Sequence, residues 1–327
     1  MRIGTVEGDG PASFGGGQLS VALHPGGDVL VLDHQAREIR RFAADGGFVG
    51  KIGGPGQGPG EFDAPTGILI DHQARIWVPE AFAGRYSIFD PDGRLIRTLP
   101  RKLRGYNRLR ALHFEGPGAF IDHAAVGGAG FFRVDTTGAV LDTFPPIAYV
   151  PLPPRLGGPL RGPPDAPLRV AVRHFLPRTI WALAPDGTLW TGRTDALRLV
   201  QRTLEGDTLR IVESRHREGR FTREEAGIVD RATRELGGPS PFRPQVMSAI
   251  HVLDDGHLLV QIAGEMGGAG GVFDVFDPEG RFLGSMPTPF AMPSIHVPAL
   301  VGDTIIAVDT DAWDVRYVVS AVIRRVR

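Results

Sequence analysis

Short runs of alternating apolar and polar residues, separated by turns rich in glycine and proline, extend along the whole chain. Runs of this length and period are typical of β-strands. The clearest block lies between residues 56 and 99. Its four strands are predicted near Ile68 and over residues 76–78, 85–89 and 95–99. Four strands joined by short connections predict one antiparallel sheet.

The block recurs with a period of about 45 residues, the range expected for propeller blades. The second strand has six copies, at 29–31, 76–78, 119–121, 189–191, 258–260 and 305–307. The turn between the third and fourth strands has five copies, each ending in glycine, at 42–46, 90–93, 134–138, 204–206 and 276–280. Glycine suits a turn position that needs φ > 0. We therefore predict an all-β, six-bladed β-propeller with four-stranded antiparallel blades.

The fourth strand of the last blade is missing at the C-terminal end and is expected at the other end. Residues 2–6, followed by 8–14, parallel residues 49–52 followed by 56–62. The N-terminal strand is therefore predicted to pair with residues 315–322, which closes the last blade and leaves no free sheet edge there. Residues 1–327 are expected to form a single domain.

The second blade carries a family resemblance. Gly58-Pro59-Gly60-Glu61-Phe62, Ala64-Pro65-Thr66-Gly67-Ile68, Ile76-Trp77-Val78 and residues 85–89 resemble an NHL repeat. The whole chain is similar to the six-bladed NHL-like propellers found in many bacteria, which are often exported. The resemblance implies a scaffold and favours an exported or periplasmic location, although residues 1–6 read as a strand and show no signal peptide.

Two insertions interrupt the repeat, and both connect a fourth strand to the next first strand. Residues 145–167 are rich in proline and predict an ordered but irregular segment. Residues 213–246 contain a predicted helix over 222–236, with a capping box from Thr222 to Glu225 and a stop at Gly237. Both insertions are candidate lids.

Composition excludes several classes of function. The net charge of −1 argues against nucleic acid as a partner. No apolar run approaches the roughly 18 residues of a transmembrane segment. Cysteine is absent, so disulfides, thiolate metal sites and cysteine nucleophiles are excluded.

The loop after each second strand begins at an equivalent position, and five of these positions are polar: Asp33, Glu80, His123, Arg193 and Asp309. In a propeller such loops converge at the mouth of the central channel, so these residues are candidate ligand-binding residues. First strands begin near the same mouth and add Arg110, Arg178 and His296. The alternative is that each acid pairs with a base at the start of the next strand, as Glu80 could with Arg85 or Asp309 with Arg316.

Histidines on several first strands are candidate metal ligands, namely His24, His113, His251 and His296. If they converged, one divalent metal ion would be the expected cofactor. The alternative is that each is a hydrogen-bonded packing residue. Propeller lactonases hold calcium through acidic and asparagine oxygens, and the single asparagine here, Asn107, argues against that ligand set.

Two functions remain open. The first is a binding module that recognises a small molecule or a protein partner at the channel mouth. The second is a metal-assisted hydrolase or lyase acting at the same mouth. Trp313, in the last blade's loop, is expected to be exposed and is a candidate for stacking on a ligand. A repeated pentapeptide, Asp-His-Gln-Ala-Arg at 33–37 and 71–75, is out of blade register and is predicted to lie in unrelated turns.

Overall fold

A computed structural model of the chain describes residues 1–5, 10–15, 17–80, 82–103, 113–116, 118–125, 129–148, 150–151, 153, 156, 163–264, 271–290, 298–311, 313 and 315–324. The chain forms two compact units. Unit 1 consists of Met1–Ile147 together with Pro289–Arg327, and unit 2 is Ala148–Thr288. The sequence predicts that residues 1–327 form a single domain. Because this depends on how the two units are placed, it stays a prediction.

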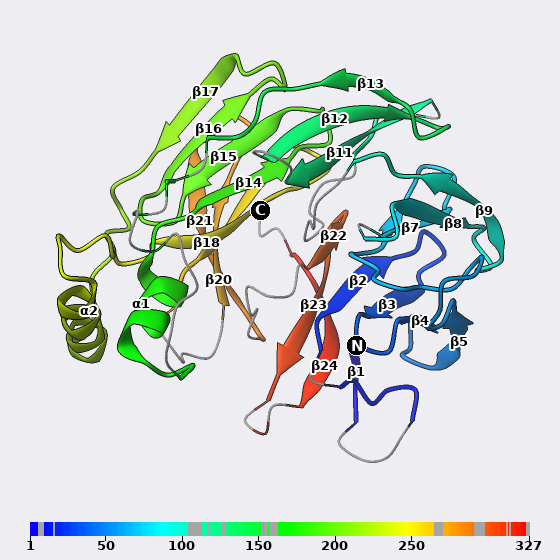
Figure 1. Cartoon of the computed structure of the whole chain (residues 1–327), viewed down its shortest axis with the longest axis horizontal. Helices are drawn as coiled ribbons and strands as arrows, with labels where there is room; N and C mark the ends of the chain where they lie inside the picture. Colours follow the sequence, from blue (N-terminus) through cyan, green and yellow to red (C-terminus); the bar gives the residue numbers. More distant parts are fainter. Residues whose placement is uncertain are drawn as a thin grey trace. The chain divides into compact units, whose positions relative to one another are not determined.

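In the described part of the chain the strands form six four-stranded antiparallel sheets, and each sheet is one blade (Figure 1). Neighbouring strands in a sheet are consecutive in the sequence, except that β1 completes the last one. The predicted number of sheets and strands per sheet is confirmed.

Unit 1 contains blades 1, 2, 3 and 6. Blade 1 is β2 (Leu19–Leu23), β3 (Val29–Asp33), β4 (Glu38–Phe42) and β5 (Phe48–Ile52). Blade 2 is β6 (Leu69–Ile70), β7 (Ile76–Glu80), β8 (Arg85–Phe89) and β9 (Leu95–Pro100). Blade 3 is β10 (His113–Phe114), β11 (Ala119–Ala125), β12 (Ala129–Asp135) and β13 (Val140–Thr143). Blade 6 is β22 (Ala299–Val301), β23 (Thr304–Thr310), β24 (Arg316–Val322) and β1 (Arg2–Ile3).

Unit 2 contains blades 4 and 5 and two helices. Blade 4 is β14 (Thr179–Leu183), β15 (Leu189–Arg193), β16 (Arg198–Arg202) and β17 (Thr208–Glu213). Blade 5 is β18 (Met247–Val252), β19 (Leu258–Ile262), β20 (Gly271–Phe276) and β21 (Phe282–Thr288). The helices are α1 (Pro167–Phe175) and α2 (Arg223–Leu236).

The N-terminal strand closes blade 6, as the repeat pattern predicts. Arg2 lies opposite Val319 and Ile3 opposite Val318 in antiparallel register, so β1 (dark blue in Figure 1) runs beside β24 (red). Ile3 is buried in the core between blades 6 and 1. The strand is shorter than predicted, and Val6 lies outside the described residues.

The second strand of blade 1 is apolar on both faces because blade 1 is packed between blades 6 and 2. In β3, Val29 and Val31 contact the side of blade 6, whereas Leu30 and Leu32 contact blade 2. Successive side chains of a strand point to opposite faces, so a strand buried on both sides has no polar positions to alternate. The same arrangement places Trp77 between blades 2 and 3, and Trp190 between blades 4 and 5.

The five predicted glycine turns between third and fourth strands all form. Their glycines have positive φ, from 83° at Gly138 to 107° at Gly206. At Gly138 a Cβ would also collide with the carbonyl oxygen of Pro100, a backbone atom that cannot turn aside. At Gly187, in the β14–β15 turn, φ is similar, 80°, but no atom lies near the position of a Cβ.

Gly138→Ala should therefore destabilise the protein more than Gly187→Ala. Both substitutions cost about 1 kcal/mol or more for the left-handed backbone, and only Gly138→Ala adds a clash. We expect Gly138→Ala to cost about 2–3 kcal/mol in total. Urea unfolding of the two variants measures the difference, and equal losses would show that the turn relaxes freely.

The helix predicted in the second insertion is confirmed. Thr222 Oγ1 accepts from Glu225 N at 3.2 Å, and Glu225 Oε2 accepts from Thr222 N at 2.8 Å, which is a capping box. Gly237 ends the helix in the left-handed conformation. A second helix, α1, begins at the last residue of the proline-rich insertion and was not predicted. It is short, it lacks a side-chain cap at Ala166, and its start is set by Pro167 at the first turn.

The two helices pack on each other rather than on a blade's strands (Figure 1, green and olive). Ala171 and Phe175 of α1 and Val229 and Ala232 of α2 belong to one buried cluster. Burial against α2 therefore stabilises α1, since an isolated helix of nine residues is unstable in water.

Thr222→Ala should cost about 1 kcal/mol, because it leaves the N–H of Glu225 without its cap. Thr222→Ser keeps the hydroxyl and should retain most of the stability. Chemical unfolding of both variants tests this. If serine cost as much as alanine, the cap would not be the source of the effect.

Candidate functional site

Asp33 lies at the end of β3 and organises the loop that follows. Its Oδ1 accepts hydrogen bonds from the backbone N–H groups of Gln35, at 3.0 Å, and Ala36, at 2.9 Å. Its Oδ2 lies 3.5 Å from Arg40 Nη2. The Asp33 side chain is almost fully buried. Its carboxylate therefore stabilises the loop that follows β3 through these hydrogen bonds.

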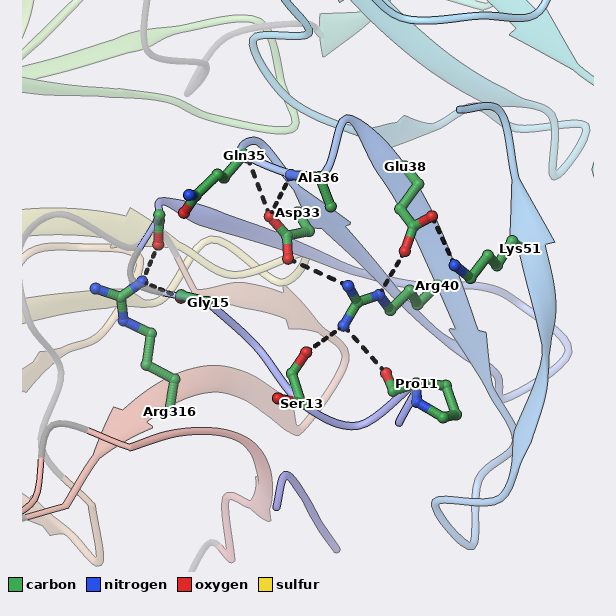
Figure 2. A network of polar contacts seen from close by, with 11 residues as sticks. Pro11, Ser13, Gly15, Asp33, Gln35, Ala36, Glu38, Arg40, Lys51 and Arg316 are labelled. Atoms are coloured by element: carbon green, nitrogen blue, oxygen red, sulfur yellow. Dashed lines mark hydrogen bonds and ion pairs between the residues drawn. The ribbon is translucent and has the colours of Figure 1, made fainter. Parts of the chain in front are cut away.

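Arg40, on β4, joins this loop to the N-terminal segment (Figure 2). Its Nε donates to Glu38 Oε1 at 2.8 Å, and its Nη1 donates to the carbonyl oxygens of Pro11 and Ser13. Lys51 Nζ donates to the other oxygen of Glu38 at 2.8 Å. Burial alone would raise the pKa of Glu38, but the hydrogen bonds from Lys51 and Arg40 hold it below its ordinary value. The network is therefore ionised and largely satisfied.

A cavity of about 310 Å³ opens beside this network, lined by Gly15, Asp33, Gln35, Ala36 and Arg40. The surface that its walls expose is mostly apolar, and the amide of Gln35 is the exposed polar side chain among them. Because Asp33 and Arg40 are held by several hydrogen bonds each, these walls are set before any ligand arrives. Gly15 and Gln35 are the exposed members of the set, and Gln35 is the one with a polar side chain.

One rim of the cavity is fastened to blade 6. Arg316 donates from Nη1 to the carbonyl oxygens of Gly15 and Gly17, as Figure 2 shows for Gly15. Gln35 packs against Gly17, where a Cβ would come within 2.8 Å of the Gln35 Cβ. Arg316, the first residue of β24, therefore contacts the segment that borders the cavity, and the loop between β23 and β24 ends just before it.

That loop carries Trp313, which is 86% exposed. Asp311 holds the loop, because its Oδ1 accepts from the backbone N–H of Trp313, at 2.9 Å, and of Val315, at 3.0 Å. The hydroxyl of Tyr317 donates to Asp311 Oδ2 at 3.1 Å. The other three tryptophans, Trp77, Trp181 and Trp190, are buried. Trp313 is thus an exposed aromatic ring on an anchored loop, as the sequence predicts.

Glu80, at the equivalent position of blade 2, is fully buried. Arg85 Nε donates to its Oε1 at 2.7 Å, and the backbone N–H of Asp63 donates to its Oε2 at 2.8 Å. The predicted Glu80–Arg85 pair therefore forms. Arg85 also donates to the carbonyl oxygens of Gln57 and Glu61, so the pair ties the segment before blade 2 to its third strand.

Blades 2 and 3 meet at a buried ion pair that the sequence did not predict. Arg101 Nε donates to Asp122 Oδ2 at 2.8 Å, and the two side chains are 3% and 2% exposed. The hydroxyl of Tyr86 donates to the same carboxylate oxygen. Burial and the neighbouring Asp122 raise the pKa of Tyr86, so the phenol stays protonated. The available signal was a charged residue, Asp122, inside an otherwise apolar second strand.

The candidate His123 follows Asp122 and is buried. Its ring lies 4.9 Å from that of Phe131, and its carbonyl oxygen accepts from Arg101 Nη2. Burial, with a further contribution from Arg101, lowers the pKa of His123 to about 4. The imidazole is therefore neutral at pH 7.

The remaining candidates have varied surroundings. Arg193 pairs with Asp195 at 2.8 Å. The backbone N–H of Arg178 donates to Thr194 Oγ1, and Asp309 Oδ1 accepts from the backbone N–H of Thr310. Arg110 and His296 lie outside the described residues. Whether the candidates form one ligand site stays a prediction, because Arg193 and Arg178 belong to unit 2.

Three of the histidines proposed as metal ligands, His24, His113 and His251, are described, and they lie in separate blades. His24 Nδ1 accepts from the N–H of Gly26, and its Nε2 lies 3.2 Å from the carbonyl oxygen of Ala74. The ring of His251 packs edge-on against Phe273, and His113 lies on β10. Among the described residues no three His, Asp or Glu side chains are arranged to hold a metal ion.

Residues 17–99 match the DUF5128 family, described as a 6-bladed beta-propeller. A member of the duf4221 family from Bacteroides vulgatus has a similar structure, with TM-score 0.57, 12% identity and coverage of 95% of this chain and 94% of that one. A Bacteroides fragilis protein has TM-score 0.55 and 10% identity, over 99% and 95% of the two chains. The chain is a six-bladed β-propeller.

These likenesses concern the fold alone. A gluconolactonase from Xanthomonas campestris also matches, with TM-score 0.48, 14% identity and coverage of 92% and 84%, which is too distant to carry an argument about chemistry. No curated protein matches the sequence significantly. Within the described residues, neither helix is long and apolar enough to cross a membrane. The NHL-like assignment stays a prediction.

Proposed function

We propose that this propeller is a binding module that recognises a small polar molecule at the cavity beside Asp33 and Arg40, with Trp313 at its edge. The observations that carry the proposal are a cavity lined by Asp33, Gln35 and Arg40, and an exposed tryptophan on the anchored loop before β24, whose first residue, Arg316, contacts Gly15 of the cavity. Exposing a tryptophan forgoes the stabilisation that burial would provide, and such rings are enriched where proteins bind.

The state of the buried acids favours binding over catalysis at this face. Asp33 and Glu80 are buried and engaged by arginines and backbone N–H groups. A general base needs a free lone pair directed at substrate, and these carboxylates use theirs to hold loops. The exposed Gln35 and Trp313 are left to contact a ligand.

The chemistry of the cavity indicates the class of ligand. The exposed walls are mostly apolar, the amide of Gln35 supplies a donor and an acceptor, and Asp33 and Glu38 offset the charge of Arg40. This suits a neutral molecule with hydroxyl or amide groups along one edge, and a flat apolar face that can stack on an indole.

A thermal-shift screen of sugars, amides and amino-acid derivatives tests the proposal. For the compound that stabilises the protein most, Trp313→Ala and Gln35→Ala should each weaken binding about tenfold, roughly 1.4 kcal/mol. Phe48→Ala is the matched control, because Phe48 is an exposed aromatic on the outer strand β5. Binding that is unchanged in both site variants, or lost equally in the control, would refute the proposed site.

A further inference from the structure

A serine, a histidine and an aspartate form a hydrogen-bonded chain in unit 2. His216 and Ser214 lie in the connection that follows β17, and Asp274 lies on β20. The Oγ of Ser214 is hydrogen-bonded to Nδ1 of His216, and Nε2 of His216 lies 2.8 Å from Asp274 Oδ2. The order of contacts is hydroxyl, imidazole, carboxylate.

Exposure to solvent changes along this chain. Asp274 is fully buried, the His216 side chain is 29% exposed, and Ser214 is partly exposed. The carboxylate is therefore at the protected end, and both the imidazole and the hydroxyl are partly accessible to solvent. Nucleophile, base and orienting group are arranged in this order in hydrolases that act through an activated serine.

Asp274 has enough hydrogen-bond partners without His216. Arg217 donates to both carboxylate oxygens, at 3.1 and 2.9 Å, and Ser285 Oγ donates to Oδ1 at 2.6 Å. Arg217 alone supplies the charge that a buried carboxylate requires. His216 adds a further contact, and its other ring nitrogen faces Ser214.

The carboxylate sets the tautomer of the imidazole. Burial alone would raise the pKa of Asp274, but hydrogen bonds from Arg217, Ser285 and His216 hold it below its ordinary value. An ionised carboxylate accepts a hydrogen bond from Nε2–H, which leaves the lone pair on Nδ1 for the hydroxyl of Ser214. Phe282 lies against the ring, with centroids 4.3 Å apart, and limits its rotation.

We propose that Ser214 is a nucleophile activated by His216, that Asp274 is a positioning residue, and that small carboxylic esters are the substrate class. The Ser214 Oγ would form a bond to the ester carbonyl carbon while its proton passes to His216 Nδ1. The C–O bond to the alcohol breaks, and the alcohol takes that proton. Water then attacks the acyl-serine through the same base, which releases the acid and restores Ser214. This site is separate from the cavity of unit 1.

A fluorophosphonate probe tests the nucleophile without a known substrate, because the serine oxygen displaces fluoride and stays bonded to phosphorus. We expect a single adduct by intact mass, mapped to Ser214 by peptide analysis. His216→Gln should slow labelling about 100-fold, the lower range for loss of a general base. Hydrolysis of p-nitrophenyl acetate should follow the same order.

Matched controls separate reactivity from folding. Ser248→Ala removes a partly buried serine of β18, and His257→Gln removes a histidine whose Nδ1 lies 3.0 Å from Asp255. Both should label at the wild-type rate, whereas Ser214→Ala should not label. The proposal is overturned if folded wild-type protein gives no adduct at Ser214, or if His216→Gln labels as fast as wild type. Failure here would leave the binding proposal for unit 1 untouched.

Discussion

Asp122→Ala is expected to destabilise the protein by about 3–5 kcal/mol, the usual range for removing one partner of a buried ion pair. The substitution would leave the guanidinium of Arg101, which is 3% exposed, without its counter-charge. It would also remove the acceptor of the Tyr86 hydroxyl and of the backbone N–H of His123. Urea unfolding followed by tryptophan fluorescence measures the loss, with Trp77 as a reporter because its ring packs against Tyr86.

Two further variants distinguish charge from packing. Tyr86→Phe removes one neutral donor and should cost about 1–2 kcal/mol. The double substitution Arg101→Met with Asp122→Leu removes both charges and should recover much of the loss, since a buried pair is often replaceable by apolar groups. If the double variant were as unstable as Asp122→Ala, the shapes of the side chains, rather than an uncompensated charge, would be responsible.

Stability should fall by up to about 3 kcal/mol as the pH is lowered from 6.5 to 4, because of His123. Its pKa is about 4 in the folded protein, against an ordinary value of 6.5, with burial as the main cause. Between these values the unfolded chain binds a proton that the folded chain does not, so acid favours unfolding. The figure follows from 1.36 kcal/mol per pH unit between the two values.

Urea unfolding of wild type and His123→Gln at several pH values measures this dependence. The variant should show a flatter profile above pH 4.5. The pKa of His174 is also lowered, by burial and then by Arg173 and Arg178, and its share should persist in the variant. Carboxylates with lowered pKa values, such as Glu38 and Asp274, also make stability depend on pH, but at a lower pH than His123 does. An equally steep profile in His123→Gln would show that His123 is not the source.

The fold could be predicted because its signals are local and repeated. A glycine at the end of each third-to-fourth turn has one physical cause, the positive φ found at Gly46, Gly93 and their equivalents. The apolar second strands have one cause as well, burial on both faces. Each blade repeats these requirements. A blade whose own sequence pattern is weak can therefore be predicted from its alignment with the other blades.

The repeated pentapeptide shows where local sequence stops being sufficient. At both sites the aspartate side chain accepts from backbone N–H groups of its own turn. The turns differ, because the residue with positive φ is Arg37 in one and Ala74 in the other. One copy follows a second strand and the other joins β6 to β7. The flanking strands determine the conformation of the turn. The pentapeptide itself contributes only the aspartate side chain that accepts the backbone hydrogen bonds.

The candidate site was harder to predict because its contacts join distant parts of the chain. Arg40 reaches Pro11 and Ser13, and Arg316 reaches Gly15 and Gly17. Spacing along the sequence does not specify such contacts. The Glu80–Arg85 pair was predictable because the two residues face each other at the start of one β-hairpin. The cluster around Asp274 joins residues about sixty positions apart, and no sequence motif indicated it.

Acrylamide quenching of tryptophan fluorescence tests the proposed binding face most directly, because Trp313 is the exposed one of the four tryptophans. We expect one readily quenched component in the free protein, which disappears in Trp313→Phe. Adding the compound that most stabilises the protein should shield that component in wild type and much less in Gln35→Ala. If the accessible component stays fully quenchable when the compound is saturating, Trp313 does not lie at the binding face.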